Sequence, residues 1–143
     1  MIKIFLERKK IRENKQLNFM LFIGSKVKIV DNTAATFGKC IRIINPPSMF
    51  SNRAFCLGYV ILVSLLKVKM DKKLKKGDIH LALIVRINKN VKRVYGDIRF
   101  FENHIILLNK KYLPLGNKIK GPVSQELRNR KYVRILSMST FVF

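Results

Sequence analysis

Acidic residues are scarce in this sequence. Eight Asp and Glu stand against 30 Lys and Arg, so the 143-residue chain carries a formal net charge of +22, while 48% of its residues are still apolar. Disordered basic tails gain charge by giving up apolar residues. Because acids are so few, the surface cannot carry an even mixture of positive and negative charge. A surface with charge of one sign repels itself and suits a free monomer poorly. The composition therefore predicts a folded core with a polyanionic partner, and nucleic acid phosphate is the commonest polyanion in a cell.

Cysteines are also few, and there is no long apolar run. Cys40 and Cys56 are separated by fifteen residues and follow no CxxC pattern, which indicates reduced thiols rather than a disulfide. The longest apolar run, residues 59–66, contains eight residues including Ser64. A membrane-spanning helix needs about 20. The run is bounded by Gly58 and Lys67, which favours a buried strand, and no membrane partner is predicted.

Residues for catalysis are equally sparse. His80 and His104 are the only histidines, and the sequence contains no phosphate-binding glycine loop, no metal-ligand spacing and no Ser/His/Asp pattern. Four of the acids lie beside turns or helix starts, where carboxylates cap backbone N–H groups; these are Asp31, Asp78, Asp97 and Glu126. The prediction is a protein that is not an enzyme and has no catalytic residues, metal site or cofactor.

The chain divides into a leader and one domain. Residues 1–19 form a basic N-terminal extension with six positive and two negative side chains and no serine. A mitochondrial transit peptide is Arg- and Ser-rich and nearly free of acids, so this segment is interpreted as a retained, ordered extension. Residues 20–143 are predicted to form a single β-barrel domain.

Short strands separated by turns dominate residues 20–143. The Lys75-Lys76-Gly77-Asp78 sequence predicts a tight turn between two strands, and residues 45–57 read as a polar and aromatic loop. Several short strands with little helix indicate a small five-stranded β-barrel of mainly β class, with a short C-terminal helical segment. The predicted strands are residues 25–30, 40–44, 59–69, 79–88, 98–100, 105–108 and 133–136, and the predicted helix is residues 122–128.

Basic residues interleave with the apolar strands and gather in the turns. Such positions can reach phosphates, and a purely solvated face is normally mixed in sign. Arg42, Arg86 and Arg99 lie within predicted strands, which favours fixed, bidentate phosphate contacts. Most aromatic residues are predicted to pack in the core. Tyr95, beside Gly96 at a predicted exposed tip, is the exception and is a candidate for stacking on bases.

Five collinear motifs resemble the universal large-subunit ribosomal protein fourteen family over about six-sevenths of the chain. Any one of these short motifs is weak evidence, but five in register are strong. They are Val30-Asp31-Asn32-Thr33-Ala34-Ala35; Cys40-Ile41-Arg42-Ile43; Lys73 to Asp78 with Ala82 to Arg86; Ile98-Arg99-Phe100 with Asn103 and Leu107-Leu108-Asn109; and Gly116 to Val123 with Glu126-Leu127-Arg128.

The resemblance implies a structural role in the large ribosomal subunit. It implies binding to large-subunit rRNA, neighbouring ribosomal proteins, and a place at the subunit interface facing small-subunit rRNA. The residues expected to bind rRNA are Arg42, Lys73, Lys75, Lys76, Arg86, Lys92, Arg93 and Arg99, and those expected at the subunit interface are Lys118, Lys120 and Arg128. A free basic nucleic-acid-binding barrel, such as an RNA chaperone or translation factor, is the alternative.

Three departures from the family pattern stand out. Ala34 replaces a family glycine, so a turn that needs positive φ is expected to be strained or rebuilt. The tip at 94–97 is shorter than in the family pattern, and the loop at 45–57 is about three residues longer than in that pattern.

Residue usage indicates an AT-rich genome. The chain has 17 Ile and 11 Asn but only four Ala and four Pro, and a need for positive charge gives no reason to prefer Ile and Asn. The mitochondrion, in the matrix ribosome, is the expected location, with a plastid or the bacterial cytoplasm as alternatives.

Overall fold

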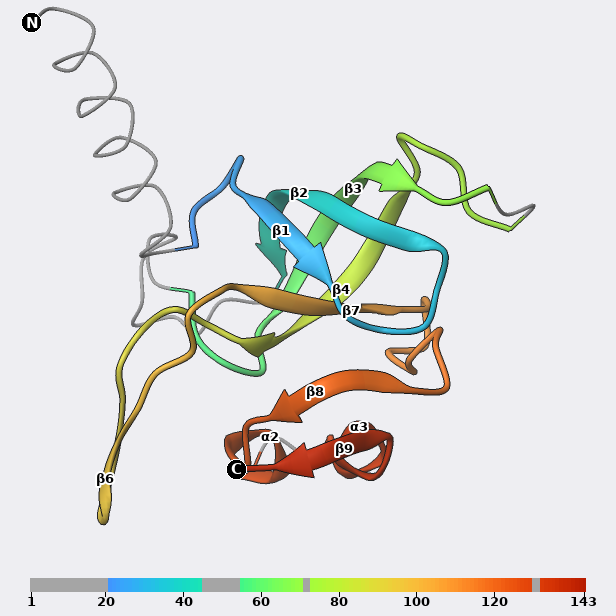
Figure 1. Ribbon diagram of the computed structural model, residues 1–143. Coiled ribbons are helices and arrows are strands. Elements are labelled where there is room, and N and C mark those ends of the chain that lie inside the picture. Colours follow the sequence, from blue (N-terminus) through green and yellow to red (C-terminus); the bar gives the residue numbers. More distant parts are fainter. Residues whose placement is uncertain (1–20, 45–54, 71–72, 130–131) are drawn as a thin grey trace, which may run out of the picture.

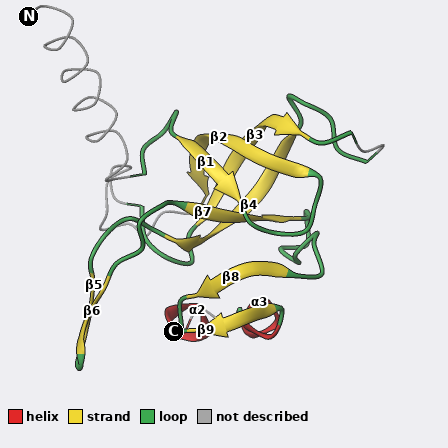
Figure 2. Ribbon diagram, viewed as in Figure 1, coloured by secondary structure: helices red, strands yellow, loops and turns green. Residues whose placement is uncertain are grey.

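The structure is a computed structural model that describes residues 21–44, 55–70, 73–129 and 132–143. The predicted extension at 1–19 and most of the predicted loop at 45–57 lie outside the described residues. Strands predominate in the described part, and two short helices lie near the C-terminus (Figure 2). The predicted mainly β class with a short C-terminal helical segment is confirmed.

Five strands form a closed barrel, as the sequence predicts (Figure 1). Neighbouring strands are antiparallel, except that the first and last pair in parallel and so close the barrel. The predicted tight turn joins β3 to β4, where the Lys75 carbonyl accepts from the Asp78 backbone N–H at 3.2 Å. The strands are β1 (Lys26–Ile29), β2 (Ala35–Ile44), β3 (Val60–Val68), β4 (Ile79–Arg86) and β7 (His104–Leu108).

Alternating side chains explain why these segments are strands. In β1, Val27 and Ile29 are buried in the barrel core while Lys26 and Lys28 are exposed, as the period of two requires. In β2, Gly38 allows a close approach, because a Cβ there would stand 2.2 Å from Cγ1 of Val63. The two cysteines are free thiols, as predicted.

The C-terminal part packs against the barrel as a separate layer (Figure 1). Strand β8 (Ile119–Val123) pairs in parallel with β9 (Ser139–Val142), and α2 (Glu126–Asn129) and α3 (Val133–Ser137) lie between them in sequence. Their apolar side chains form a second cluster with residues on the outer face of the barrel. This cluster fixes the position of the basic residues in the C-terminal part.

Two sequence predictions in this layer are wrong. The predicted helix at 122–128 begins only at Glu126, because Pro122 and Val123 belong to β8. Pro122 is compatible with that strand since β8 belongs to a two-stranded sheet and is an edge strand. The predicted strand at 133–136 is the helix α3. Its adjacent residues Ile135 and Leu136 are both buried, a pattern of helix packing that overrides the β-propensity of Val and Ile.

A two-stranded hairpin projects from the barrel (Figure 1). Strand β5 (Val91–Arg93) pairs with β6 (Gly96–Ile98), so the strand predicted at 98–100 instead ends at its first residue. Tyr95 is fully exposed at the tip, as predicted, but the prediction that most aromatic residues pack in the core is wrong for the described residues. Phe22, Phe101, Tyr112, Phe141 and Phe143 are exposed as well. Ala34 does not have a positive φ, because Tyr112 is the one non-glycine residue with positive φ among the described residues, so the strain considered for this turn is absent.

Candidate nucleic-acid interface

A face of the barrel collects cations from three adjacent strands. Lys26 on β1 lies directly opposite Lys39 on β2. Phe37 on β2 lies between Lys28 on β1 and Lys67 on β3. Directly opposite residues project from the same side of a sheet. The four lysines are exposed, and the Nζ of Lys26 lies 4.3 Å from the ring centroid of Phe37. We call this surface the lysine face; it consists of Lys26, Lys28, Lys39, Arg42 and Lys67.

Arg42, which is exposed on β2, is the one residue of the lysine face that is predicted from the sequence to bind rRNA. The other four residues were missed as phosphate contacts. The alternation Lys26-Val27-Lys28-Ile29 is a signal that places two lysines on one face. Lys39 and Lys67 join this face only through the pairing of the strands, which is seen in the tertiary structure and not in the local sequence pattern.

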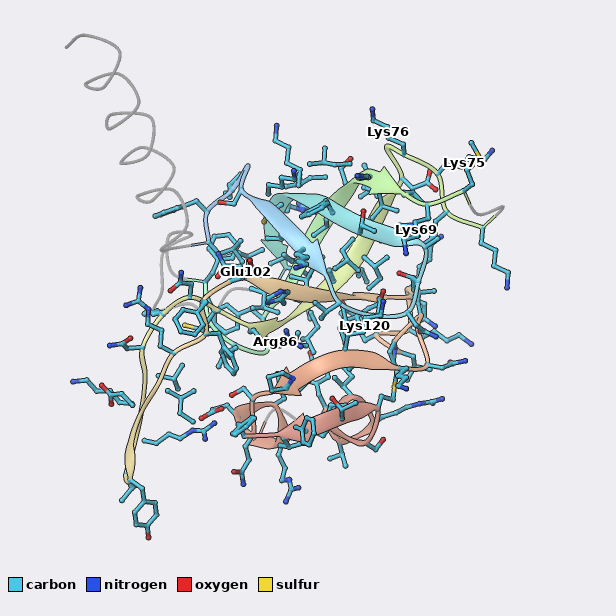
Figure 3. All side chains as sticks on the ribbon, in the orientation of Figure 1. Lys69, Lys75, Lys76, Arg86, Glu102 and Lys120 are labelled. Atoms are coloured by element: carbon cyan, nitrogen blue, oxygen red, sulfur yellow. The ribbon has the colours of Figure 1, made fainter. Side chains whose placement is uncertain are left out.

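The turn between β3 and β4 presents a second group of cations. Lys73, Lys75 and Lys76 are exposed there. Asp78 closes the turn, because its carboxylate accepts from the backbone N–H of Lys75 at 2.8 Å, and Gly77 has a φ of +92°. Figure 3 shows Lys75 and Lys76 projecting from this end of the molecule. The predicted capping role of Asp78 is confirmed.

The hairpin and the residues after it hold a third group. Lys92 and Arg99 are exposed, and Nε of Arg99 donates to Oδ1 of Asn88 at 2.9 Å. Arg93 is half-buried and forms an ion pair with the carboxylate of Glu126 in α2. The same guanidinium donates to the Phe143 carbonyl at 2.8 Å. The hydrogen bond from Arg93 holds the pKa of Glu126 below its usual value.

Arg86 does not belong to the surface, which corrects its predicted role as a phosphate contact. Its side chain donates from Nε to the Pro122 carbonyl and from Nη2 to the Lys120 carbonyl, and the residue is 8% exposed. In Figure 3 it lies between the barrel and β8. Gly121 makes room, since a Cβ there would stand 2.7 Å from Nη2. Desolvation lowers the pKa of Arg86, and the arginine joins β4 to β8.

Asp31 organises the loop after β1. Its Oδ2 accepts from the Leu107 backbone N–H at 2.9 Å, and its Oδ1 accepts from the Thr33 backbone N–H at 3.1 Å and from the Thr33 hydroxyl. Burial raises the pKa of Asp31 despite these bonds. The carboxylate therefore caps backbone N–H groups, as the sequence predicts, and ties the loop to β7.

Asn32 positions the segment predicted to face the small subunit. Its Oδ1 accepts from the backbone N–H of Asn117 at 2.8 Å and of Lys118 at 3.3 Å. Gly116 permits this approach, because a Cβ there would lie 2.7 Å from that oxygen. Lys118 and Lys120 are exposed on either side of the buried Ile119.

The third predicted interface residue, Arg128, lies in another element of the C-terminal part. It is exposed in α2. The neighbouring Leu127 is fully buried and anchors the helix in the second apolar cluster. The structure therefore holds this guanidinium on a fixed element, separate from the segment that carries the two lysines.

The histidines and acids of the described residues form few contacts with one another. Desolvation, the positive charge of Arg86 and smaller effects lower the pKa of His104 to about 4, although its Nε2 lies 3.2 Å from Glu102.

Among residues 21–44, 55–70, 73–129 and 132–143, no three His, Cys, Asp or Glu side chains are grouped to hold a metal ion. Helices in these ranges are too short or too polar to cross a membrane.

The described residues form a small, closed, basic β-barrel with exposed cations on several faces. The family model described as Ribosomal protein L14p/L23e matches residues 20–143. This match covers most of the chain, and the chain belongs to that family. It is therefore a structural protein of the large ribosomal subunit, located in the ribosome. Its partners in that subunit are ribosomal RNA and other ribosomal proteins.

Proposed function

We propose that this protein binds large-subunit rRNA directly and neutralises phosphate charge at several places on its surface. The observation that carries the proposal is the lysine face, where the strand register sets cations side by side on a rigid sheet. Cations on a rigid sheet contact phosphates without the cost of ordering a loop, although each lysine side chain still loses rotamer freedom. The other proposed contacts are exposed in the β3–β4 turn and near the hairpin; they are Lys73, Lys75, Lys76, Lys92 and Arg99.

Arg93 contributes to this surface less directly. Its guanidinium is engaged by Glu126, Ser124 and the carbonyl of Phe143, so its main effect is to hold the hairpin against the C-terminal part. Arg86 is left out of the proposed contacts because it is buried. The protein acts by charge and position, without a catalytic step.

Salt dependence of binding tests the rRNA contact. If six to ten phosphates are neutralised, the slope of log K against log salt for the full chain and an rRNA fragment is about −5 to −9. Changing Lys39→Gln and Lys67→Gln together reduces that slope by about two. The matched control changes Lys110→Gln and Lys111→Gln, which removes the same charge from exposed lysines outside the proposed contacts. A wild-type slope shallower than about −2 contradicts the proposal.

We further propose that Lys118, Lys120 and Arg128 face the small-subunit rRNA. Changing Lys118→Glu and Lys120→Glu weakens subunit joining, measured by light scattering, and leaves assembly of the large subunit largely intact. The matched control, Lys75→Glu with Lys76→Glu, impairs assembly of the large subunit instead. Normal joining in the first variant rules out the interface assignment.

The alternative is a free RNA chaperone or translation factor. A structural protein stays with the large subunit in a sucrose gradient after a high-salt wash, whereas a free factor is released. The residue usage supports a mitochondrial ribosome over a plastid or bacterial one, and subcellular fractionation with mass spectrometry decides between these locations.

A further inference from the structure

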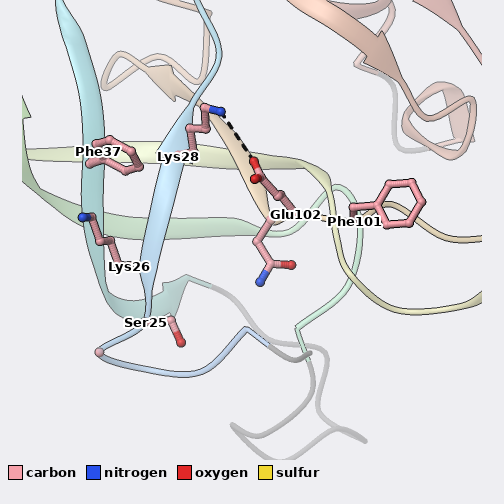
Figure 4. Close-up of a pocket in the computed structure, with 8 residues that line it drawn as sticks. Ser25, Lys26, Lys28, Phe37, Phe101 and Glu102 are labelled. Carbon is pink, nitrogen blue, oxygen red and sulfur yellow. Dashed lines mark hydrogen bonds and ion pairs between the residues drawn. The ribbon is translucent and has the colours of Figure 1, made fainter. Parts of the chain in front are cut away.

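A notch of about 500 Å³ lies on the outside of the barrel, between the start of β1 and the segment that leads into β7 (Figure 4). Its volume falls within the range of about 300–1,000 Å³ that is typical of small-molecule sites. Lysines and phenylalanines both line it, together with one acid. The residues that matter here are Lys26, Lys28, Phe37, Phe101 and Glu102.

Phe101 is the unusual member of this notch. The residue is 93% exposed, and Figure 4 shows its ring at one side of the notch, directed away from Phe37. The backbone that carries it is held firmly. Asn88, itself buried, donates from Nδ2 to the Phe101 carbonyl at 2.9 Å, and its backbone N–H donates to Oδ1 of Asn103 at 2.8 Å. An exposed aromatic ring on a backbone that is held in place is available to stack on a base.

The charged side chains of the notch leave room for an anion. Lys26 lies over the face of Phe37. The Nζ of Lys28 lies 3.5 Å from Oε2 of Glu102, and both side chains of that pair are more than half exposed. Exposed ion pairs are weak, so a phosphate competes readily for Lys28. Glu102 therefore occupies the place at which a phosphate oxygen would meet the lysine.

We infer that the notch holds one unstacked nucleotide of the rRNA, with its base on Phe101 and its phosphate between Lys26 and Lys28. This inference rests on the proposed function, since it specifies how one part of the surface meets RNA. An apolar segment of a neighbouring protein is the other occupant that would cover Phe101. The lysines favour RNA, because Lys39 adds a further positive charge opposite Lys26.

Binding of two single-stranded RNA octamers to the full chain tests the stacking contact. One octamer carries mixed bases and the other has the same backbone without bases. Phe101→Ala lowers affinity for the base-bearing octamer by at least about fivefold and leaves the abasic octamer unchanged. The matched control is Phe141→Ala, an exposed ring in β9, which changes neither. Equal affinities of wild type and Phe101→Ala for the base-bearing octamer overturn the inference.

Removing the competing acid tests the phosphate contact. Glu102→Gln strengthens octamer binding and steepens the salt slope by about 0.7, the value for one additional phosphate on a single strand. Asp97→Asn makes the same change in net charge on the hairpin, outside the notch, and leaves the slope unchanged. A slope that is the same in wild type and Glu102→Gln contradicts the phosphate position.

A photo-crosslinker in place of Phe101 identifies the occupant in the assembled subunit. Crosslinks to rRNA support the inference, and crosslinks to a protein, or none, overturn it. Failure of the notch is distinct from failure of the proposed function. If the full chain binds rRNA with a steep salt slope but Phe101 makes no difference, only the notch is wrong. If the wild-type chain does not bind rRNA, the proposed function fails as well.

Discussion

Arg86 is a buried cation that stabilises the fold, whereas most cations of this protein lie on its surface. A buried arginine is stable only when its donors are satisfied, and here the carbonyls of Pro122 and Lys120 accept from it. Neither carbonyl belongs to the barrel. The side chain therefore connects the barrel to β8 through backbone carbonyls of β8.

The variant Arg86→Met is expected to lower the free energy of unfolding by about 2–4 kcal/mol, because two charge-assisted hydrogen bonds are lost and their acceptors stay buried. Chemical denaturation followed by circular dichroism measures the change. The control, Arg42→Met, removes an exposed arginine and changes stability by about 0.5 kcal/mol or less. Equal effects of the two variants would show that Arg86 is not a structural residue.

At the scale of elements, the ion pair of Arg93 and Glu126 links the hairpin to the C-terminal layer. Both side chains are about three-quarters buried, at 25% and 28% exposed. The Ser124 hydroxyl also donates to the Glu126 carboxylate. Because the pair spans two elements that share no sheet, it restricts how the hairpin sits relative to α2.

A double-mutant cycle with Arg93→Met and Glu126→Gln is expected to give a coupling energy of about 1 kcal/mol near pH 7. The pKa of Glu126 is lowered from 4.5 by its bond with Arg93. As pH falls, the unfolded chain therefore binds the proton first, and the coupling disappears as pH passes below the lowered pKa. Unfolding measured at a series of pH values from about 7 downward tests whether the coupling decreases with pH. A coupling that persists in acid would contradict the assignment.

At the scale of the whole molecule, the net charge of +22 opposes compactness in the free chain. Like charges repel across the surface, and dissolved salt screens that repulsion within about 10 Å at 0.1 M. Few ion pairs between described residues compensate this charge: Lys28 pairs with Glu102, and Arg93 pairs with Glu126.

The melting temperature of the free chain is therefore expected to rise by a few degrees between about 20 and 300 mM sodium chloride. Differential scanning fluorimetry measures it. The variant Lys39→Glu with Lys67→Glu lowers the net charge by four, from +22 to +18, and its melting temperature responds less to salt. If wild type and variant respond equally, self-repulsion does not limit stability.

Local pattern predicted the five strands of the barrel, although β2 begins at Ala35 and not at Cys40, and it predicted the capping roles of Asp31 and Asp78. Runs of aliphatic and β-branched residues end at turn residues in each case, and the acids beside those turns cap backbone N–H groups, as Asp31 and Asp78 do. Local pattern was misleading at residues 133–136. There, burial of Ile135 and Leu136 against the second apolar cluster selects a helix, and that contact depends on residues far away in the chain.

The sequence by itself determined that the chain folds around an apolar core, that its surface is positive, and that it resembles a ribosomal family, because composition and short motifs need no three-dimensional context. Only the tertiary structure decided which cations are available. Arg86 and Arg99 look alike in sequence, yet one is buried under β8 and the other is exposed. Lys26 and Lys39 lie far apart in sequence, yet they face each other across two strands. Burial and cross-strand register depend on long-range contacts, which a local pattern does not contain.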